Sequence, residues 1–197
     1  AAGYMLKAKH NKRMLAYSSV EHMGILSLGV GIGGFAVFGA LLHAINHSVT
    51  KAMLFLTAGN IHSRFHTKRF AKITGLVKYM PVSGVLWMAG FLAIVGSPPF
   101  GLFISEFTIL RAGVSQHLWW AIALFVIFLI LAFIGMANVF LHMFFGKTEE
   151  VSRRENKSAV IPVFVFALLV LFLGFWIPGW LTDLINRAAL VISGATG

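Results

Sequence analysis

The 197-residue chain contains no cysteine, only six acidic residues and few charged residues of any kind. Without cysteine it has no thiol nucleophile, disulfide, cysteine-based metal site or iron–sulfur ligands of its own. Charged residues make up 11% of the chain and hydrophobic residues 58%, whereas soluble domains carry roughly 25% charged residues. This composition excludes an ordinary soluble domain and predicts an all-α polytopic membrane protein.

Basic residues exceed acidic ones, which gives a formal net charge of +10. They lie in short segments between apolar runs, a pattern that indicates membrane topology, so we expect no nucleic-acid partner. Loop charges place the N-terminal side in the cytoplasm if every predicted helix spans; everything after residue 114 switches sides if the helix at 100–114 does not. We expect a multi-pass protein of the cell (inner) membrane, in contact with the lipid bilayer.

Apolar periodicity predicts about six hydrophobic helices in a single membrane domain, residues 1–197. The string GSPPFG at 96–101 removes two backbone donors, so we expect a helix that is discontinuous at Pro98-Pro99, or else a tilted span. The tail at 180–192 combines apolar residues with Asp183 and Arg187, as interfacial helices do. The predicted helices are 14–33 and 35–61 (a pair within 14–61), 81–95 and 100–114 (a helix and a broken helix within 81–115), 118–145 and 159–176.

Polar residues interrupt the apolar helix predicted at 35–61. A lysine at the bilayer centre, here Lys51, costs about 2.5–3.5 kcal/mol on insertion scales, and such residues commonly mark ion pathways. His43 and His47 precede it at spacings that put all three on one helix face. Because imidazole accepts a proton on one nitrogen and releases one from the other, this face predicts a proton path. The alternative is a set of polar groups that join helices by hydrogen bonds.

Three further ionisable residues lie within apolar stretches. Glu106 follows the Pro-Pro break and is either a second proton site beside broken backbone or a carboxylate that reaches interfacial water. Glu21 and His22 belong either to the path or to an interfacial ion pair. A zinc site at His43 and His47 is disfavoured by the neighbouring lysine and by the lack of a local carboxylate, so we predict no metal site.

The chain contains no Ser-His-Asp arrangement, phosphate-binding loop or redox motif. We therefore assign no catalytic residue, no cofactor-binding residue and no cofactor, and leave open whether the protein is part of an enzyme.

Four strings, KRMLAYSSVEHMG, HAINHSVTKAMLFLTAG, MPVSG and GSPPFGLFISEF, resemble those of one membrane-protein family. These are the proton-translocating antiporter-like subunits of respiratory complex I, membrane-bound hydrogenases and multisubunit cation/proton antiporters. The similarity runs over about residues 10 to 115, and GSPPFGLFISEF is most similar to the F component of hydrogenase-4 and of formate hydrogenlyase-type complexes. The match corresponds to the C-terminal part of the family fold and, with a first residue that is not Met, is compatible with a fragment of a larger chain.

The resemblance implies roles for individual residues. Lys51 matches the central proton site, His43 and His47 match the path that connects it, and Glu106 matches the terminal site on the discontinuous helix. Lys12, with Arg13, matches a basic pair that precedes the LAYSS string in the family. The family fold has two inverted repeats, and this chain holds the second.

We therefore expect a proton-translocating membrane subunit, or a fragment of one, in a redox-driven complex of hydrogenase-4, formate hydrogenlyase or complex I type. Its partners would be the other membrane subunits of a hydrogenase or complex I-like assembly, and protons would be the transported species. The driving redox chemistry would belong to partner subunits. Two alternatives are a subunit of a multisubunit Na⁺/H⁺ antiporter and a structural membrane anchor without its own proton path.

Overall fold

The computed structural model describes residues 1–5, 11–66, 73–146 and 155–194. Within these ranges the regular structure is entirely helical, as the composition predicts. In chain order the helices are α1 (Ala2–Met5), α2 (Asn11–Ile32), α3 (Phe35–Phe65), α4 (Leu76–Tyr79), α5 (Pro81–Ile94), α6 (Gly101–Ser115), α7 (Trp119–Phe144), α8 (Lys157–Phe175) and α9 (Gly179–Ile192).

The helices α2 and α3 form an antiparallel hairpin through a two-glycine turn. Gly33 and Gly34 have φ values of 79° and 55°, in the left-handed region that favours glycine. Further along the hairpin, a Cβ added to Gly29 would lie 2.9 Å from Cβ of Ala40. The absence of a side chain at Gly29 therefore lets the two helices approach closely.

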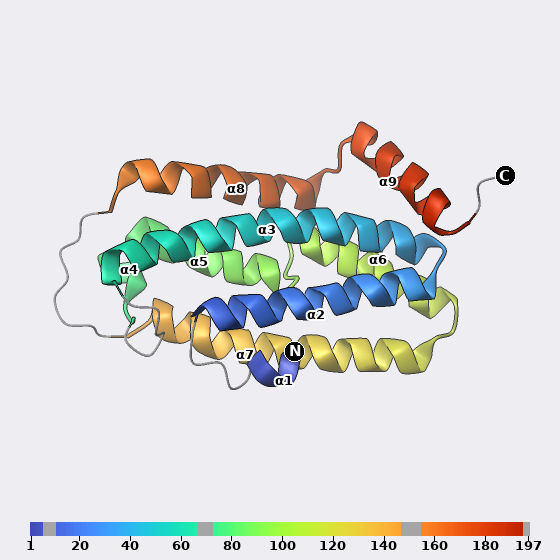
Figure 1. Ribbon diagram of the computed structural model, residues 1–197, viewed down its shortest axis with the longest axis horizontal. Coiled ribbons are helices and arrows are strands. Elements are labelled where there is room, and N and C mark those ends of the chain that lie inside the picture. The colour runs from blue at the N-terminus through green and yellow to red at the C-terminus, as the bar shows by residue number, and fades with distance from the viewer. Residues whose placement is uncertain (6–10, 67–72, 147–154, 195–197) are drawn as a thin grey trace.

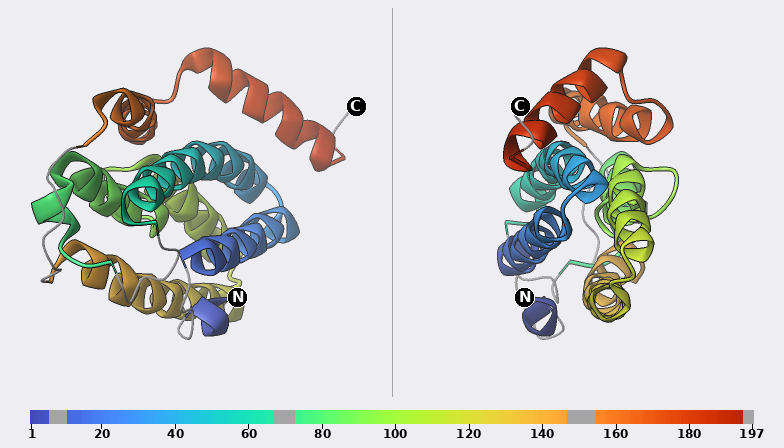
Figure 2. Two further views of the ribbon diagram at one scale, coloured as in Figure 1. Left: turned by 60° about the vertical axis from the view of Figure 1, so that its left-hand side comes forward. Right: turned by 90° about the vertical axis from the view of Figure 1, so that its right-hand side faces the viewer.

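The helix α3 is the centre of the bundle. It packs against α2, α5, α6, α8 and α9, and Figure 1 shows it running along the long axis of the molecule between α2 and α8. Both views in Figure 2 agree that α2 and α7 lie on one side of it and α8 and α9 on the other. Residues on α3 are therefore enclosed on several sides, which explains how polar side chains there become buried.

The segment between α5 and α6 is the predicted break. The helix α5 ends at Ile94 and α6 begins at Gly101, and Figure 1 shows α6 lying beyond the end of α5. The helix α5 begins at Pro81. Proline is favourable there because an N–H at the first position of a helix has no acceptor within the helix. The carboxylate of Glu155 accepts hydrogen bonds from N of Val82 and of Ser83, at 3.1 and 2.8 Å, and so caps the same end.

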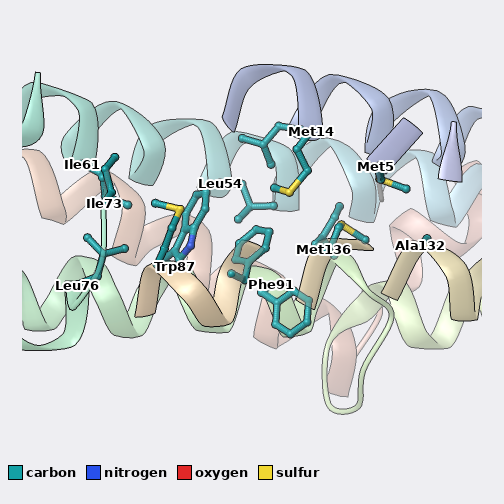
Figure 3. Close-up of a cluster of buried hydrophobic side chains, with 14 of the residues drawn as sticks. Met5, Met14, Leu54, Ile61, Ile73, Leu76, Trp87, Phe91, Ala132 and Met136 are labelled. Atoms are coloured by element: carbon teal, nitrogen blue, oxygen red, sulfur yellow. The ribbon is translucent and has the colours of Figure 1, made fainter. Parts of the chain in front are cut away.

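An apolar core holds α2, α3, α5 and α7 together. Trp87 and Phe140 are fully buried, with ring centroids 4.3 Å apart. Leu54 and Met136 belong to the same cluster, and Figure 3 shows the side chains of Trp87, Phe91 and Leu54 converging between the helices. This cluster fixes α3, and with it the polar residues that α3 carries, relative to α5 and α7.

Large apolar side chains also cover the outside of the molecule. Phe128 and Ile130 on α7 and Phe164, Leu168 and Phe175 on α8 are each at least half exposed. In the described part of the chain, α7 and residues Ser158–Phe175 of α8 are long and apolar enough to cross a membrane. Apolar residues outside and polar residues inside are the arrangement expected in lipid, where water does not solvate the surface.

The two helices that are long and apolar enough to span a membrane are fewer than the six hydrophobic helices predicted from the sequence. The helices α2 and α3 have 22 and 31 residues, enough length for a bilayer, but polar side chains lower their apolar content. The helices α5 and α6 have 14 and 15 residues, each less than the ~20 residues a single span requires. The structure thus agrees with the all-α class and does not by itself establish six spans.

Most predicted helix boundaries lie within a few residues of those observed. The largest difference is at the end of α3, predicted at residue 61 and observed at Phe65, because polar residues continue the helix for another turn until His66, whose φ is 49°. The four-residue helices α1 and α4 were not predicted, since one turn has no periodicity to detect. The interfacial position of α9 remains a prediction; Leu181 and Ile185 of α9 pack against α3.

Candidate functional site

Polar side chains of α2 and α3 face each other in a fixed register. Ser18 meets Lys51, and His22, one turn further along α2, meets His47, one turn back along α3, with ring centroids 4.5 Å apart. His22 also contacts His43 of the preceding turn. Because side chains four residues apart share a helix face, the antiparallel hairpin turns two separate sequence patterns into one buried cluster.

The two histidines His22 and His43 share a hydrogen bond, with 2.9 Å between Nδ1 of His22 and Nε2 of His43. On its other side, Nδ1 of His43 lies 3.0 Å from Oγ of Ser105 on α6. The residues are 1%, 0% and 0% exposed. Three helices that are far apart in sequence thus contribute one side chain each to a single chain of hydrogen bonds.

The hydroxyl group of Ser105 fixes the directions in this chain. It donates its single hydrogen to the carbonyl oxygen of Leu102, 2.8 Å away, so Nδ1 of His43 must donate to Ser105. A neutral His43 then accepts at Nε2, which makes Nδ1 of His22 the donor. A neutral His22 is consequently left with a lone pair on Nε2, and this atom is buried without a hydrogen-bond partner. Nε2 of His22 is therefore the unbonded end of the chain, and the backbone of Ile94 lies close to the same ring.

Glu21 is the acidic group nearest to this unbonded nitrogen. Its Oε2 lies 3.6 Å from Nε2 of His22, and the two side chains are 8% and 2% exposed. Glu21 also lines two cavities on α2: one of about 520 Å³ shared with residues of α1 and α7, and a smaller one shared with His22. The carboxyl group is thus placed between the larger cavity and the histidines.

Lys51 is anchored on α2. Its Nζ donates to the carbonyl oxygen of Leu15 at 2.7 Å and to Oγ of Ser18. Oγ of Ser18 in turn donates to the carbonyl oxygen of Leu15 at 3.1 Å, so it accepts from the amine. Two acceptors leave the third position on Nζ for either a hydrogen or a lone pair, so the same geometry accommodates the charged and the neutral amine.

His47 lies between His43 and Lys51 on α3, but it is not hydrogen-bonded to His22, His43 or Lys51. Its Nδ1 is buried without a partner, and its ring centroid is 6.3 Å from that of His43. The sequence predicts a ladder from His43 through His47 to Lys51 along one helix. The structure places these residues on that shared face, but the direct bond from His43 goes to His22 across the hairpin.

Glu106 lies on the first turns of α6, just after the break. It is 5% exposed, and its Oε1 has no hydrogen-bond partner. Gly96, which has φ of 66°, packs directly against this carboxylate, and a Cβ there would collide with Oε2. Asn46 on α3 donates to the carbonyl oxygen of Gly101 at 2.8 Å, which holds the start of α6 against α3. The broken backbone thus brings the carboxylate close to the histidines.

The predicted site residues are brought together with one exception. One ligand atom on each of His22, His43 and Glu106 lies within 4.8 Å of those on the other two, so these side chains share one buried space in which a proton or a metal ion has several partners. The side chain of Lys12 lies outside the part of the structure that is described.

Three polar residues of this cluster were not predicted: Ser18, Asn46 and Ser105. Each is buried and hydrogen-bonded across the site. A signal was available, since Ser18 precedes Glu21 by one turn and Ser105 directly precedes Glu106, but single serines in apolar helices commonly bond to their own helix. Imidazoles and carboxyl groups this close together can accept and release protons.

The chain is similar to known membrane-complex subunits. A family model described as NADH:quinone oxidoreductase/Mrp antiporter, TM, matches residues 1–135. The hydrogenase-4 component F homolog of Methylacidiphilum infernorum (isolate V4) is 35% identical over 193 residues, which cover 98% of this chain and 40% of that relative. The M subunit of the F(420)H(2) dehydrogenase of Methanosarcina mazei is 33% identical over 200 residues, covering 98% of this chain and 39% of that relative.

Solved structures share the fold. A chain of respiratory complex I from Thermus thermophilus with bound NADH superposes with a TM-score of 0.86 at 27% identity, covering all of this chain and 42% of that one. A chain of the Mrp complex from Dietzia sp. DQ12-45-1b gives a TM-score of 0.87 at 21% identity, covering 98% and 44%. The chain therefore spans about two fifths of the length of the curated relatives it matches.

Proposed function

The chain belongs to the NADH:quinone oxidoreductase/Mrp antiporter transmembrane family, and on this basis we propose that it is part of a proton-translocating membrane subunit. The observation that carries the proposal is the buried group of ionisable side chains on α2, α3 and α6. Lys51, His22, His43 and Glu106 are each at most 6% exposed. Burying ionisable groups in a membrane bundle is costly, and such groups commonly serve ion and proton transport.

The hydrogen-bond directions suggest how a proton crosses the site. Glu21 delivers a proton to the open Nε2 of His22, and His22 then releases the proton on Nδ1 to Nε2 of His43. His43 then passes a proton to Glu106 beside the helix break, whose carboxyl group has an oxygen within 4.8 Å of a nitrogen of this imidazole pair. The two imidazoles are charged in turn and return to neutrality, while Glu21 is left ionised when it gives up its proton and an ionised Glu106 is neutralised when it accepts one.

Lys51 is the storage site in this mechanism. Its amine holds a proton through Leu15 and Ser18 and, when it is charged, favours the ionised carboxylate of Glu21, which lies one turn beyond Ser18 on α2. Moving one charge against the membrane potential requires about 2.3 kcal/mol per 100 mV. A change in the interaction among Lys51, Glu21 and Glu106 of at least that size per cycle would therefore drive the transfer.

The driving reaction belongs to partner subunits. The relatives named above are a hydrogenase-4 component F homolog and a subunit of an F(420)H(2) dehydrogenase, which favours an oxidoreductase assembly with this protein as a membrane subunit. We propose that it crosses the bacterial or archaeal cell membrane several times. In that arrangement α2, α3, α7 and α8 each span, α5 and α6 form a discontinuous span, and α9 lies at the interface.

The test uses proteoliposomes that contain the complete complex with the full-length protein. Lys51→Ala is expected to abolish redox-driven proton uptake, and Lys78→Ala, which removes an exposed lysine, serves as the matched control with unchanged uptake. Proton uptake in Lys51→Ala equal to that of the wild type would contradict the proposal. Electron transfer is measured in the same preparations to show that the complex is assembled.

A second candidate is a subunit of a multisubunit cation/proton antiporter. It is favoured by the matched family description, which includes the Mrp antiporter. In that case a sodium or potassium gradient alone would drive proton flux in the proteoliposomes. Proton flux that depends on electron transfer and not on these cations would exclude it.

A further inference from the structure

We propose that His22, His43 and Glu106 form a binding site for a zinc-type transition-metal ion, and that a bound ion blocks the proton path. One ligand atom on each residue lies within 4.8 Å of those on the other two. The residues come from α2, α3 and α6, and their packed positions hold them together. The ion binding stands on this geometry alone, whereas the block rests on the proposed function in proton translocation.

The ligand set suits zinc. Two imidazoles and one carboxylate, with a fourth position open, is a common zinc coordination shell, with bonds of about 2.0–2.2 Å. Two such ligands on a tetrahedral ion lie roughly 3.3 Å apart. Nδ1 of His22 and Nε2 of His43 are 2.9 Å apart, so a separation of a few tenths of an ångström makes room for the ion between them.

The hydrogen-bond directions supply the supporting contacts. With an ion on Nε2 of His43, Nδ1–H still donates to Ser105. With the ion on Nδ1 of His22, the hydrogen moves to Nε2, which is now unpartnered and lies 3.6 Å from Oε2 of Glu21. His43 thus has an oxygen acceptor for its second nitrogen, and a shift of about half an ångström would give His22 one, the arrangement that orients ligand histidines in metal sites.

The charges around the site also favour a cation. Glu106 has a buried oxygen without a partner, and Glu21 brings a second carboxyl group, so two carboxylates match the charge of a divalent ion. Lys51 is the opposing charge, but its amine is bonded to Leu15 and Ser18 on another turn of α2. The sequence pairs His43 with His47 and predicts no metal site, because no carboxylate is near, whereas the structure pairs His43 with His22 and brings two carboxyl groups close.

Binding is tested on the purified, metal-stripped complex that contains the full-length protein. After incubation with ZnCl₂ and removal of free ion, the wild type is expected to retain one more zinc per protein than the variants His22→Gln and Glu106→Gln. The control variant His117→Gln/His142→Gln, which removes two exposed histidines, is expected to retain as much as the wild type. X-ray absorption at the zinc edge is expected to show two imidazoles and additional oxygen ligands.

Substitution of Ser105 by Ala gives a second test that leaves all three ligands in place. Loss of a supporting contact weakens metal affinity by about 10–100-fold, so Ser105→Ala should shift the zinc titration by that factor. Equal zinc retention in wild type, His22→Gln and Glu106→Gln, or an unchanged titration in Ser105→Ala, would overturn the site.

The block is tested separately from the binding. Zinc at the concentration that fills the site is expected to stop redox-driven proton uptake by wild-type proteoliposomes and to be reversed by a chelator. Zinc retention with undiminished uptake would overturn the block and leave the binding site standing. If instead uptake proves independent of Lys51, the proposed function fails while the zinc retention still decides the binding site.

Discussion

Nδ1 of His22 lies 2.9 Å from Nε2 of His43 and joins α2 to α3 by one hydrogen bond between imidazoles. The bond is buried, and its direction is fixed by Ser105 on a third helix. A pair of imidazoles in this arrangement links the carboxyl group of Glu21 to the helix that carries Glu106. Single substitutions can therefore test this bond, the hydroxyl groups that hold His43 and Lys51, and the backbone at Gly96 beside the carboxylate of Glu106.

Replacing His22 by Phe is expected to reduce proton translocation about 100-fold, in the range found when a positioned proton-transfer group is removed. Phe fills a similar volume but has neither nitrogen, so Glu21 and His43 lose the group between them. The measurement is redox-driven proton uptake by proteoliposomes of the intact complex. His117→Phe, at an exposed position, is the control, and equal rates in the two variants would show that His22 does not carry protons.

Ser105→Ala is expected to lower both stability and transport, because Nδ1–H of His43 loses its buried acceptor. An unsatisfied buried donor costs about 1–3 kcal/mol. Ser105→Thr keeps the hydroxyl and should restore transport toward the wild-type rate. Thr108→Ala is the matched control, since Thr108 is on the same helix and donates to its own backbone, at Ile104; a loss in Thr108→Ala as large as that in Ser105→Ala would refute the role of the bond.

Ser18→Ala is expected to slow proton translocation roughly tenfold. The charged amine of Lys51 loses one hydrogen bond, and bonds to charged groups contribute about 1.5–3 kcal/mol. Ser19→Ala is the matched control, because the neighbouring hydroxyl donates to the carbonyl oxygen of Leu15 and not to the amine. The rates of the two single variants are compared in the same assay, and slower transport in Ser19→Ala than in Ser18→Ala would rule out this role for Ser18.

Gly96→Ala is expected to destabilise the protein and to impair transport together. The backbone has φ of 66°, which costs a residue with a Cβ about 1–2 kcal/mol, and the new methyl group meets the carboxylate of Glu106. Gly59→Ala on α3 is the control, because a Cβ there has no neighbour within 4 Å and alanine favours the helix. Thermal unfolding of the purified complex should show a lower Tm for Gly96→Ala and an equal or higher one for Gly59→Ala.

The main elements of the fold follow from sequence patterns. Long apolar runs predict α7 and α8, and the GSPPFG string predicts the break after α5, because two prolines at membrane depth leave no regular alternative. Helix ends are less predictable. The helix α3 continues past residue 61 through polar residues, which occur both in helices and in loops. The four residues of α1 and of α4 form single turns that depend on packing.

The candidate site could be predicted only in part. Lys51, His43 and His47 share one helix, so their spacing alone places them on one face. The bond between His22 and His43 depends on how α2 packs against α3, which the Gly33-Gly34 turn and the close contact at Gly29 determine. The contact between Ser105 and His43 depends on where α6 lies after the break. Local periodicity does not predict such a contact, because it joins segments that are distant in the sequence.

The fixed direction of the bond from His22 to His43 has a consequence for leakage. A proton that enters at Nε2 of His22 and leaves through Nδ1 reverses the hydrogen on that ring, so the imidazole then presents an N–H where it had offered a lone pair. A second proton from the same side finds no acceptor until the ring is returned to its first form. The imidazole pair would thus pass one proton each time the His22 ring returns to its first tautomer. A continuous hydrogen-bonded chain of water molecules, in contrast, conducts for as long as the chain stays intact.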